Sequence, residues 1–238
     1  MATDTSSVAP DRHPPLADAI APVRRMLRSG RQAAVDSGVR GLLRPGSRGR
    51  MVFACGTGKK LIALRTAETL DTRFLLVWCR PGTISQWAQA ARADGRREPL
   101  MAVSSPGAHK HPVLAETGAV STGSGEHLVY WLAQRAKKNE PGTVFVTLGS
   151  LPRSEEVHRS VLRAAIFDLA IVDEAHRTAG GWDKDWTVIH DSSRIRARAP
   201  LASDRDAGRT WSRPRMPAHA RNGPRTGLGA LVLDRLPR

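Results

Sequence analysis

A glycine-rich segment, Ala54-Cys-Gly-Thr-Gly-Lys-Lys60, is the first place where residue types and spacing could do chemistry. It follows the short apolar run Met51–Ala54 and precedes a helical pattern, which is the context that a phosphate-binding loop requires. Glycines let backbone amides approach phosphate oxygens, and the dipole of the following helix favours an anion there. Lys59 would then reach the β- and γ-phosphates of a nucleotide. The alternative is an ordinary glycine-rich turn between a strand and a helix.

An acidic motif, Asp173-Glu-Ala-His176, follows directly after the apolar run Leu169–Val172. Carboxylates at the end of a strand are suited to the cation and the water of phosphoryl transfer. Asp173 would hold Mg²⁺, and Glu174 would polarise the attacking water. The alternative is a surface loop that happens to be acidic. Both motifs together, in this order and each at the end of a strand-like run, favour nucleotide chemistry.

The elements that must position these motifs alternate along the chain. The sequence predicts strands over 51–54, 74–79, 100–103, 143–147 and 169–172, and helices over 31–43, 60–70, 84–93, 127–138 and 155–165. Residues 104–125 are rich in Ser, Gly, His and Pro and predict a loop. Short apolar strands separated by helices are typical of a mostly parallel α/β sheet with helices on both faces. Ligands of such sheets bind beyond the carboxyl ends of the strands.

With these motifs, residues 28–198 resemble the first RecA-like, ATP-binding P-loop domain of superfamily 2 DEAD/DEAH-box helicases. The segment Ala54–Lys59 has the family's Ala-x-x-Gly-x-Gly-Lys form, and Asp173–His176 has its acidic box. Within the group, the chain most resembles bacterial helicases related to restriction-enzyme motor subunits. The resemblance implies ATP and Mg²⁺ as cofactors, nucleic acid as partner (with DNA favoured and RNA the open alternative), and hydrolysis coupled to nucleic-acid binding or unwinding.

The resemblance also implies roles for individual residues. Asp173 is the metal ligand, Glu174 the residue that acts on water, and His176 couples the ATP site to the nucleic acid. The expected ATP contacts are Gln32, Cys55, Gly56, Thr57, Gly58, Lys59 and Lys60, and the expected contacts to the nucleic-acid backbone are Arg80, Thr83, Ser85, Thr147 and Ser150. A polar helix face is the alternative for Gln32, and capping or turn roles are the alternative for the backbone contacts.

Position 60 departs from the family pattern, which has Thr or Ser there. That hydroxyl is a Mg²⁺ ligand in P-loop enzymes, whereas the ammonium of Lys60 has donors and no acceptor. Mg²⁺-dependent hydrolysis is therefore expected to be strongly impaired. Binding of nucleotide phosphates is expected to survive, because Lys60 attracts anions.

A second departure follows the acidic box, where the family has a strand ending in Ser/Thr-Ala-Thr and then a second RecA-like domain. We expect both to be absent, with a partner chain as one possible source of the second domain. Asp204-Arg-Asp-Ala207 can be encoded by DNA that spells Thr-Ala-Thr-Pro in another frame. We therefore hypothesise a frameshift near Ala199 or Pro200, and the alternative is a natural basic extension.

Composition sets the wider expectations. We predict a flexible arm over 1–20, an incomplete ATP-binding domain over 21–199 and a basic tail over 200–238 that is disordered or out of frame, so that both termini are disordered. The net charge of +15 favours a polyanionic partner. Cys55 and Cys79 are expected to be reduced and buried in a cytoplasmic protein with no membrane span or secretory leader. The competing functions are a helicase-type ATPase, a truncated remnant that binds nucleotide or nucleic acid without turnover, and a basic module with ATP as a structural ligand.

Overall fold

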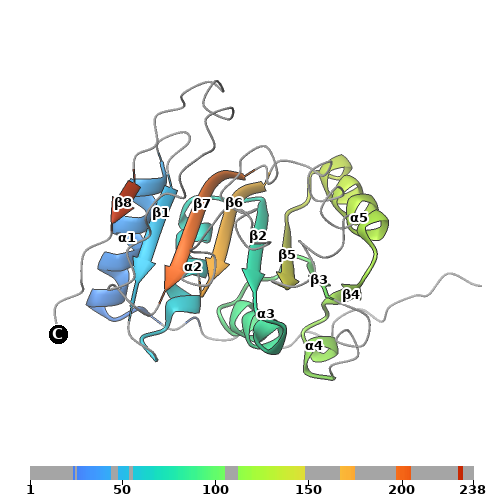
Figure 1. Cartoon of the computed structure of the whole chain (residues 1–238), viewed down its shortest axis with the longest axis horizontal. Helices are drawn as coiled ribbons and strands as arrows, with labels where there is room; N and C mark the ends of the chain where they lie inside the picture. The colour runs from blue at the N-terminus through green and yellow to red at the C-terminus, as the bar shows by residue number, and fades with distance from the viewer. Residues whose placement is uncertain are drawn as a thin grey trace, which may run out of the picture.

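One parallel sheet organises the computed structural model, which describes residues 24, 26–43, 48–53, 56–104, 112–147, 167–174, 197–204 and 230–232. Its strands are β1 Arg48–Val52, β2 Phe74–Cys79, β3 Leu100–Val103, β4 Val120–Thr122, β5 Gly142–Thr147, β6 Phe167–Asp173, β7 Ala197–Asp204 and β8 Ala230–Val232. They lie in the order β4-β3-β5-β2-β6-β7-β1-β8, and each neighbouring pair is parallel (Figure 1). All carboxyl ends therefore meet at one edge.

Helices cover both faces of the sheet (Figure 1). They are α1 Ser29–Leu42, α2 Lys59–Thr69, α3 Ile84–Ala93 (preceded by the 3-10 turn η1, Pro81–Thr83), α4 Pro112–Glu116 and α5 Gly125–Lys137. Buried side chains of α1, α2, α3 and α4 pack with Leu75, Val77 and Cys79 on one face. Those of α5 pack with Leu76 and Trp78 on the other. Successive side chains of β2 thus pack into hydrophobic cores on opposite faces of the sheet, which is why its sequence is apolar throughout.

The predicted α/β class is confirmed, and β2, β3 and α3 have the predicted bounds. The loop predicted over 104–125 is wrong in part, because α4 and β4 lie within it. Both elements are too short for a periodic pattern to reveal them. The helix predicted over 155–165 lies outside the described residues. Among the described helices, none has the length and apolar character needed to span a lipid bilayer.

The expectation that no strand follows the acidic box is wrong. Strand β7 lies between β6 and β1 inside the sheet, and its Leu201 is fully buried. The segment has little β propensity, and proline is unfavourable inside a sheet. Pro200 is tolerated next to Ala170 because the pairing with β1 begins one residue later, at Leu201. The predicted boundary after residue 199 falls inside this strand.

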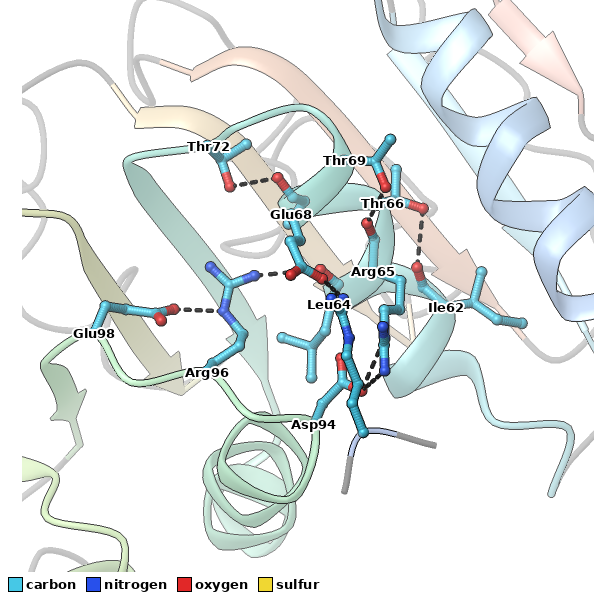
Figure 2. Close-up of polar contacts among 12 residues, drawn as sticks. Ile62, Leu64, Arg65, Thr66, Glu68, Thr69, Thr72, Asp94, Arg96 and Glu98 are labelled. Atoms are coloured by element: carbon cyan, nitrogen blue, oxygen red, sulfur yellow. Dashed lines mark hydrogen bonds and ion pairs between the residues drawn. The ribbon is translucent and has the colours of Figure 1, made fainter. Parts of the chain in front are cut away.

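An ion-pair network fixes α2 against the segment that leads into β3 (Figure 2). Arg65 Nε donates to Asp94 Oδ1 over 2.8 Å, and both side chains are largely buried. Arg96 pairs with Glu98 and also donates to the carbonyl of Leu64 over 3.2 Å. Figure 2 shows Arg96 placed between these two acceptors. The network holds α2, whose first turn carries the lysines of the glycine-rich loop.

Candidate functional site

The glycine-rich loop lies between β1 and α2, at the carboxyl edge of the sheet. Gly56 has φ of +79° and Gly58 has φ of +89°, in the left-handed region that favours glycine. A Cβ atom built on Gly56 would have no neighbour within 4 Å, so open space faces the loop there. No side chain among the described residues caps the start of α2 at Gly58. This geometry fits the close approach of a phosphate to the backbone. Cys55 lies outside the described residues.

Two cationic side chains, Lys59 and Arg31, hold the glycine-rich loop and the residue before it. Lys59 Nζ donates to the carbonyl of Phe53 over 3.0 Å, and its side chain is partly buried. Arg31 Nε donates to the carbonyl of Thr57 over 2.9 Å. A Cβ atom on Gly58 would lie 3.2 Å from Arg31 Nε, so the guanidinium packs directly against this glycine. Both cations therefore hold the loop through its carbonyl oxygens.

Gln32 is exposed on α1. Its Nε2 donates to Asp36 Oδ1 over 2.8 Å, four residues further along the exposed face of α1. This is the arrangement expected of a polar helix face. Arg31, its neighbour in the chain, contacts the loop.

The acidic pair ends β6. Asp173 and Glu174 are buried, with exposures of 6% and 5%. Asp173 Oδ2 accepts a hydrogen bond of 3.0 Å from Trp87 Nε1, a fully buried indole of α3. Glu174 has φ of +58°, an uncommon conformation for a residue with a side chain. Such backbone conformations persist where the surroundings enforce them, and they cluster at functional sites. His176 lies outside the described residues.

Lys60, in the first turn of α2, contacts the helix α3 that carries Trp87. Its Nζ donates to Gln86 Oε1 over 2.6 Å and lies 6.0 Å from the centroid of the Trp87 ring. Burial lowers the pKa of Lys60, while the nearby carboxylates of Asp173 and Glu174 raise it. The ammonium group therefore lies against α3, over the indole that donates to Asp173.

Two of the residues expected to contact a nucleic-acid backbone, Thr83 and Thr147, lie at the carboxyl edge of the sheet. The Thr83 hydroxyl is buried in η1 and donates to the carbonyl of Arg80 over 3.0 Å, which is a turn role. Thr147 is buried at the end of β5, beside Cys79 in the strand register. The free thiol of Cys79 is buried, as expected, and burial raises its pKa to about 12. Ser150 lies outside the described residues.

The site fits a nucleotide phosphate but not a magnesium ion. Two ammonium groups and an open glycine loop favour an anion. Position 60 carries an ammonium, which has no acceptor, where the resemblance implies a hydroxyl oxygen, and one oxygen of Asp173 already accepts from Trp87. The oxygen donors that Mg²⁺ prefers are thus reduced, and a positive charge opposes it.

The sequence patterns gave no role at the site to four residues that the structure places there, which are Arg31, Gln86, Trp87 and Ser203. Ser203 lies beside Asp173 in the register of β6 and β7 and is fully buried. Its hydroxyl has no hydrogen-bond partner among the described residues. Gln86 and Trp87 stand in a correctly predicted helix, but only the pairing of β2 with β6 brings that helix to Asp173.

Comparisons with known proteins place this geometry in a family. The family model described as Type III restriction enzyme, res subunit, matches residues 24–197. A comparison with curated proteins finds no match.

Three solved structures show the same fold. A nuclease-deletion mutant of the Type ISP restriction-modification enzyme LlaGI, in complex with a DNA substrate mimic, has a TM-score of 0.61 at 20% identity over 76% of this chain and 18% of its own. The ATP-dependent Type ISP enzyme LlaBIII bound to DNA has a TM-score of 0.60 at 23% identity over 76% and 12%. The Hef helicase domain of Pyrococcus furiosus has a TM-score of 0.52 at 20% identity over 80% and 34%.

The chain spans less than a fifth of either restriction enzyme, with coverages of 18% and 12%. The fold that it shares with them is the RecA-like α/β domain. Since the family model covers most of the chain, the protein belongs to the family of the type III restriction enzyme res subunit and forms a superfamily 2 helicase-like RecA-type domain.

Proposed function

We propose that this chain is the nucleotide-binding domain of an ATP-driven DNA motor of the restriction-enzyme type. One observation carries the proposal. The glycine-rich loop at the start of α2 shares the carboxyl edge of the sheet with the buried pair Asp173 and Glu174, and Lys60 in the first turn of α2 lies over Trp87, whose indole N–H donates to Asp173. A phosphate-binding loop facing buried carboxylates is the arrangement that phosphoryl transfer uses.

In this proposal, the backbone of Gly56 and Gly58 and the side chain of Lys59 hold the triphosphate. Arg31 keeps the loop in shape through the carbonyl of Thr57. Glu174 orients the attacking water. DNA is the proposed polyanionic partner, supported by the net charge of +15 and by the DNA bound in two similar structures.

The proposal is tested by nucleotide binding and turnover of the purified full chain, with and without Mg²⁺ and single-stranded DNA. Wild-type protein is expected to bind ATP. The Lys59→Ala variant is expected to lose about tenfold or more in affinity, because a charge-assisted contact to phosphate is removed. Lys137→Ala, at an exposed position of α5, is the matched control and should bind as wild type does. Equal affinity of Lys59→Ala and wild type would contradict the proposal.

A second candidate is a domain that binds nucleotide without turning it over. The ammonium of Lys60 favours it, because it stands where a hydroxyl ligand of Mg²⁺ is needed. Turnover by wild type is therefore expected to lie well below that of Lys60→Thr under saturating Mg²⁺ and DNA. Steady-state phosphate release measures the difference. Equal turnover in both proteins would show that Lys60 does not impair hydrolysis.

A further inference from the structure

We infer that Lys60 takes the place of the divalent cation, so that this site binds a nucleoside triphosphate as the free anion and excess Mg²⁺ weakens the binding. The inference rests on the proposed nucleotide-binding function and names the form of nucleotide that the site takes. It starts from the position of one ammonium group and from the groups that surround it.

The ammonium of Lys60 contacts two residues of α3. Gln86 Oε1 accepts from it over 2.6 Å, and the Trp87 ring lies beneath it at 6.0 Å. Trp87 is itself fixed, because its indole is fully buried and donates to Asp173. These two contacts favour one position of the Lys60 ammonium, whereas an ordinary surface lysine samples many side-chain conformations.

In the helicase family that the chain resembles, the residue at this sequence position supplies a metal ligand. Lys60 is in the first turn of α2, directly after the glycine-rich loop, and it lies within electrostatic reach of Asp173 and Glu174. The ammonium of Lys60 lies over the ring of Trp87, which donates to Asp173, so the chain itself places a positive charge close to the buried carboxylates. A magnesium ion at the same point would be repelled by this ammonium at short range.

The preference for the free anion follows from charge. A free triphosphate is more negative than its magnesium complex, so it gains more from the adjacent ammonium groups of Lys59 and Lys60. A site that carries a hydroxyl in place of Lys60 has the opposite balance, because the metal must then bridge the phosphates and Asp173. Exchanging this one residue should therefore reverse the effect of Mg²⁺ on affinity.

The test is calorimetric titration of ATP into the full chain, once with EDTA and once with excess MgCl₂, at matched ionic strength. For wild type, we expect affinity about tenfold or more tighter in EDTA than in MgCl₂. Lys60→Thr should bind ATP more tightly in MgCl₂. Lys60→Met, which removes the charge at similar length, should lose affinity in EDTA. Lys137→Thr, on the exposed end of α5, is the matched control and should keep the wild-type ratio. Circular dichroism confirms that each variant is folded.

Each outcome decides the inference. Wild-type protein that binds ATP more tightly in MgCl₂ overturns the inference and leaves the nucleotide-binding function standing. The same ratio of affinities in wild type and Lys60→Thr also overturns it. Wild-type protein that binds ATP in neither buffer overturns the proposed function as well. If the variants fail to fold, the ratio of the wild-type affinities for ATP in EDTA and in MgCl₂ tests the inference by itself.

Discussion

Gly58 adopts a left-handed conformation at the last position before α2, with φ of +89°. A Cβ atom there would also lie 3.2 Å from Arg31 Nε, the group that holds the Thr57 carbonyl. Gly58→Ala is therefore expected to lower the free energy of unfolding by about 1–2 kcal/mol. Urea denaturation measures the change. Gly82→Ala is the control, because its Cβ would meet nothing within 4 Å, and it should change stability little. Equal effects of the two substitutions would show that the loop conformation is not constrained.

Trp87 donates the hydrogen bond that Asp173 Oδ2 accepts, and the two residues are buried. Trp87→Phe keeps an aromatic ring but leaves that buried carboxylate oxygen without its donor. Trp78→Phe is the matched control, since Trp78 is also fully buried and its indole N–H has no acceptor among the described residues. We expect Trp87→Phe to cost about 1–3 kcal/mol more than Trp78→Phe in the free energy of unfolding. Chemical denaturation compares them, and equal costs would mean that the bond to Asp173 contributes nothing.

At the scale of elements, the strand β7 completes the sheet between β6 and β1. Its Leu201 is fully buried and fills the space over Gly49, where a Cβ atom would lie 2.8 Å from Leu201 Cδ1 and 3.2 Å from Leu42 Cδ2. Leu201 of β7 and Leu42 of α1 therefore both approach Gly49, where any larger residue would collide with them. The part of the chain beyond residue 199 therefore contributes to the core.

Leu201→Ala is expected to lower the free energy of unfolding by about 2–5 kcal/mol, because it leaves a cavity in the core. Arg198→Ala is the control on the same strand, since the Arg198 side chain is 74% exposed. Its effect should stay within about 0.5 kcal/mol. Thermal and urea unfolding of both variants make the comparison. A Leu201→Ala variant as stable as Arg198→Ala would mean that β7 does not pack in the sheet.

At the scale of the whole molecule, the net charge of +15 favours binding to a polyanion. Affinity for single-stranded DNA is expected to fall linearly with salt on logarithmic axes, because bound phosphates release counterions. Fluorescence anisotropy with a labelled oligonucleotide across a NaCl series measures the slope. An oligonucleotide with an uncharged backbone is the control and should bind weakly with no slope. Affinity independent of salt would contradict binding through phosphates.

The hypothesis that a frameshift near Ala199 or Pro200 changed the rest of the chain stays a prediction. The family model matches through residue 197, where β7 begins, so sequence likeness ends as the strand starts. Genomic DNA tests it. A shifted frame that continues into helicase-like sequence is the expected result, and the lack of such a frame would make residues 200–238 a natural extension.

Sequence alone determined the α/β class, the bounds of β2, β3 and α3, and the positions of the two motifs, because each depends on local patterns. Strands buried on both faces are apolar throughout, and glycines before a helix mark a loop whatever surrounds them. The anomaly at Lys60 was likewise visible from its residue type alone.

Only the tertiary structure decided what these residues touch. Strand β7 was missed because its stability comes from its neighbours β6 and β1 and not from its own propensity. Arg31 of α1 reaches the carbonyl of Thr57 because α1 packs beside α2, a contact that no spacing in the sequence predicts. The contacts of Lys60 with Gln86 and Trp87 depend on strand order, since β2 must lie beside β6 for α3 to reach Asp173. Strand order joins residues far apart in the chain, and no local pattern encodes it.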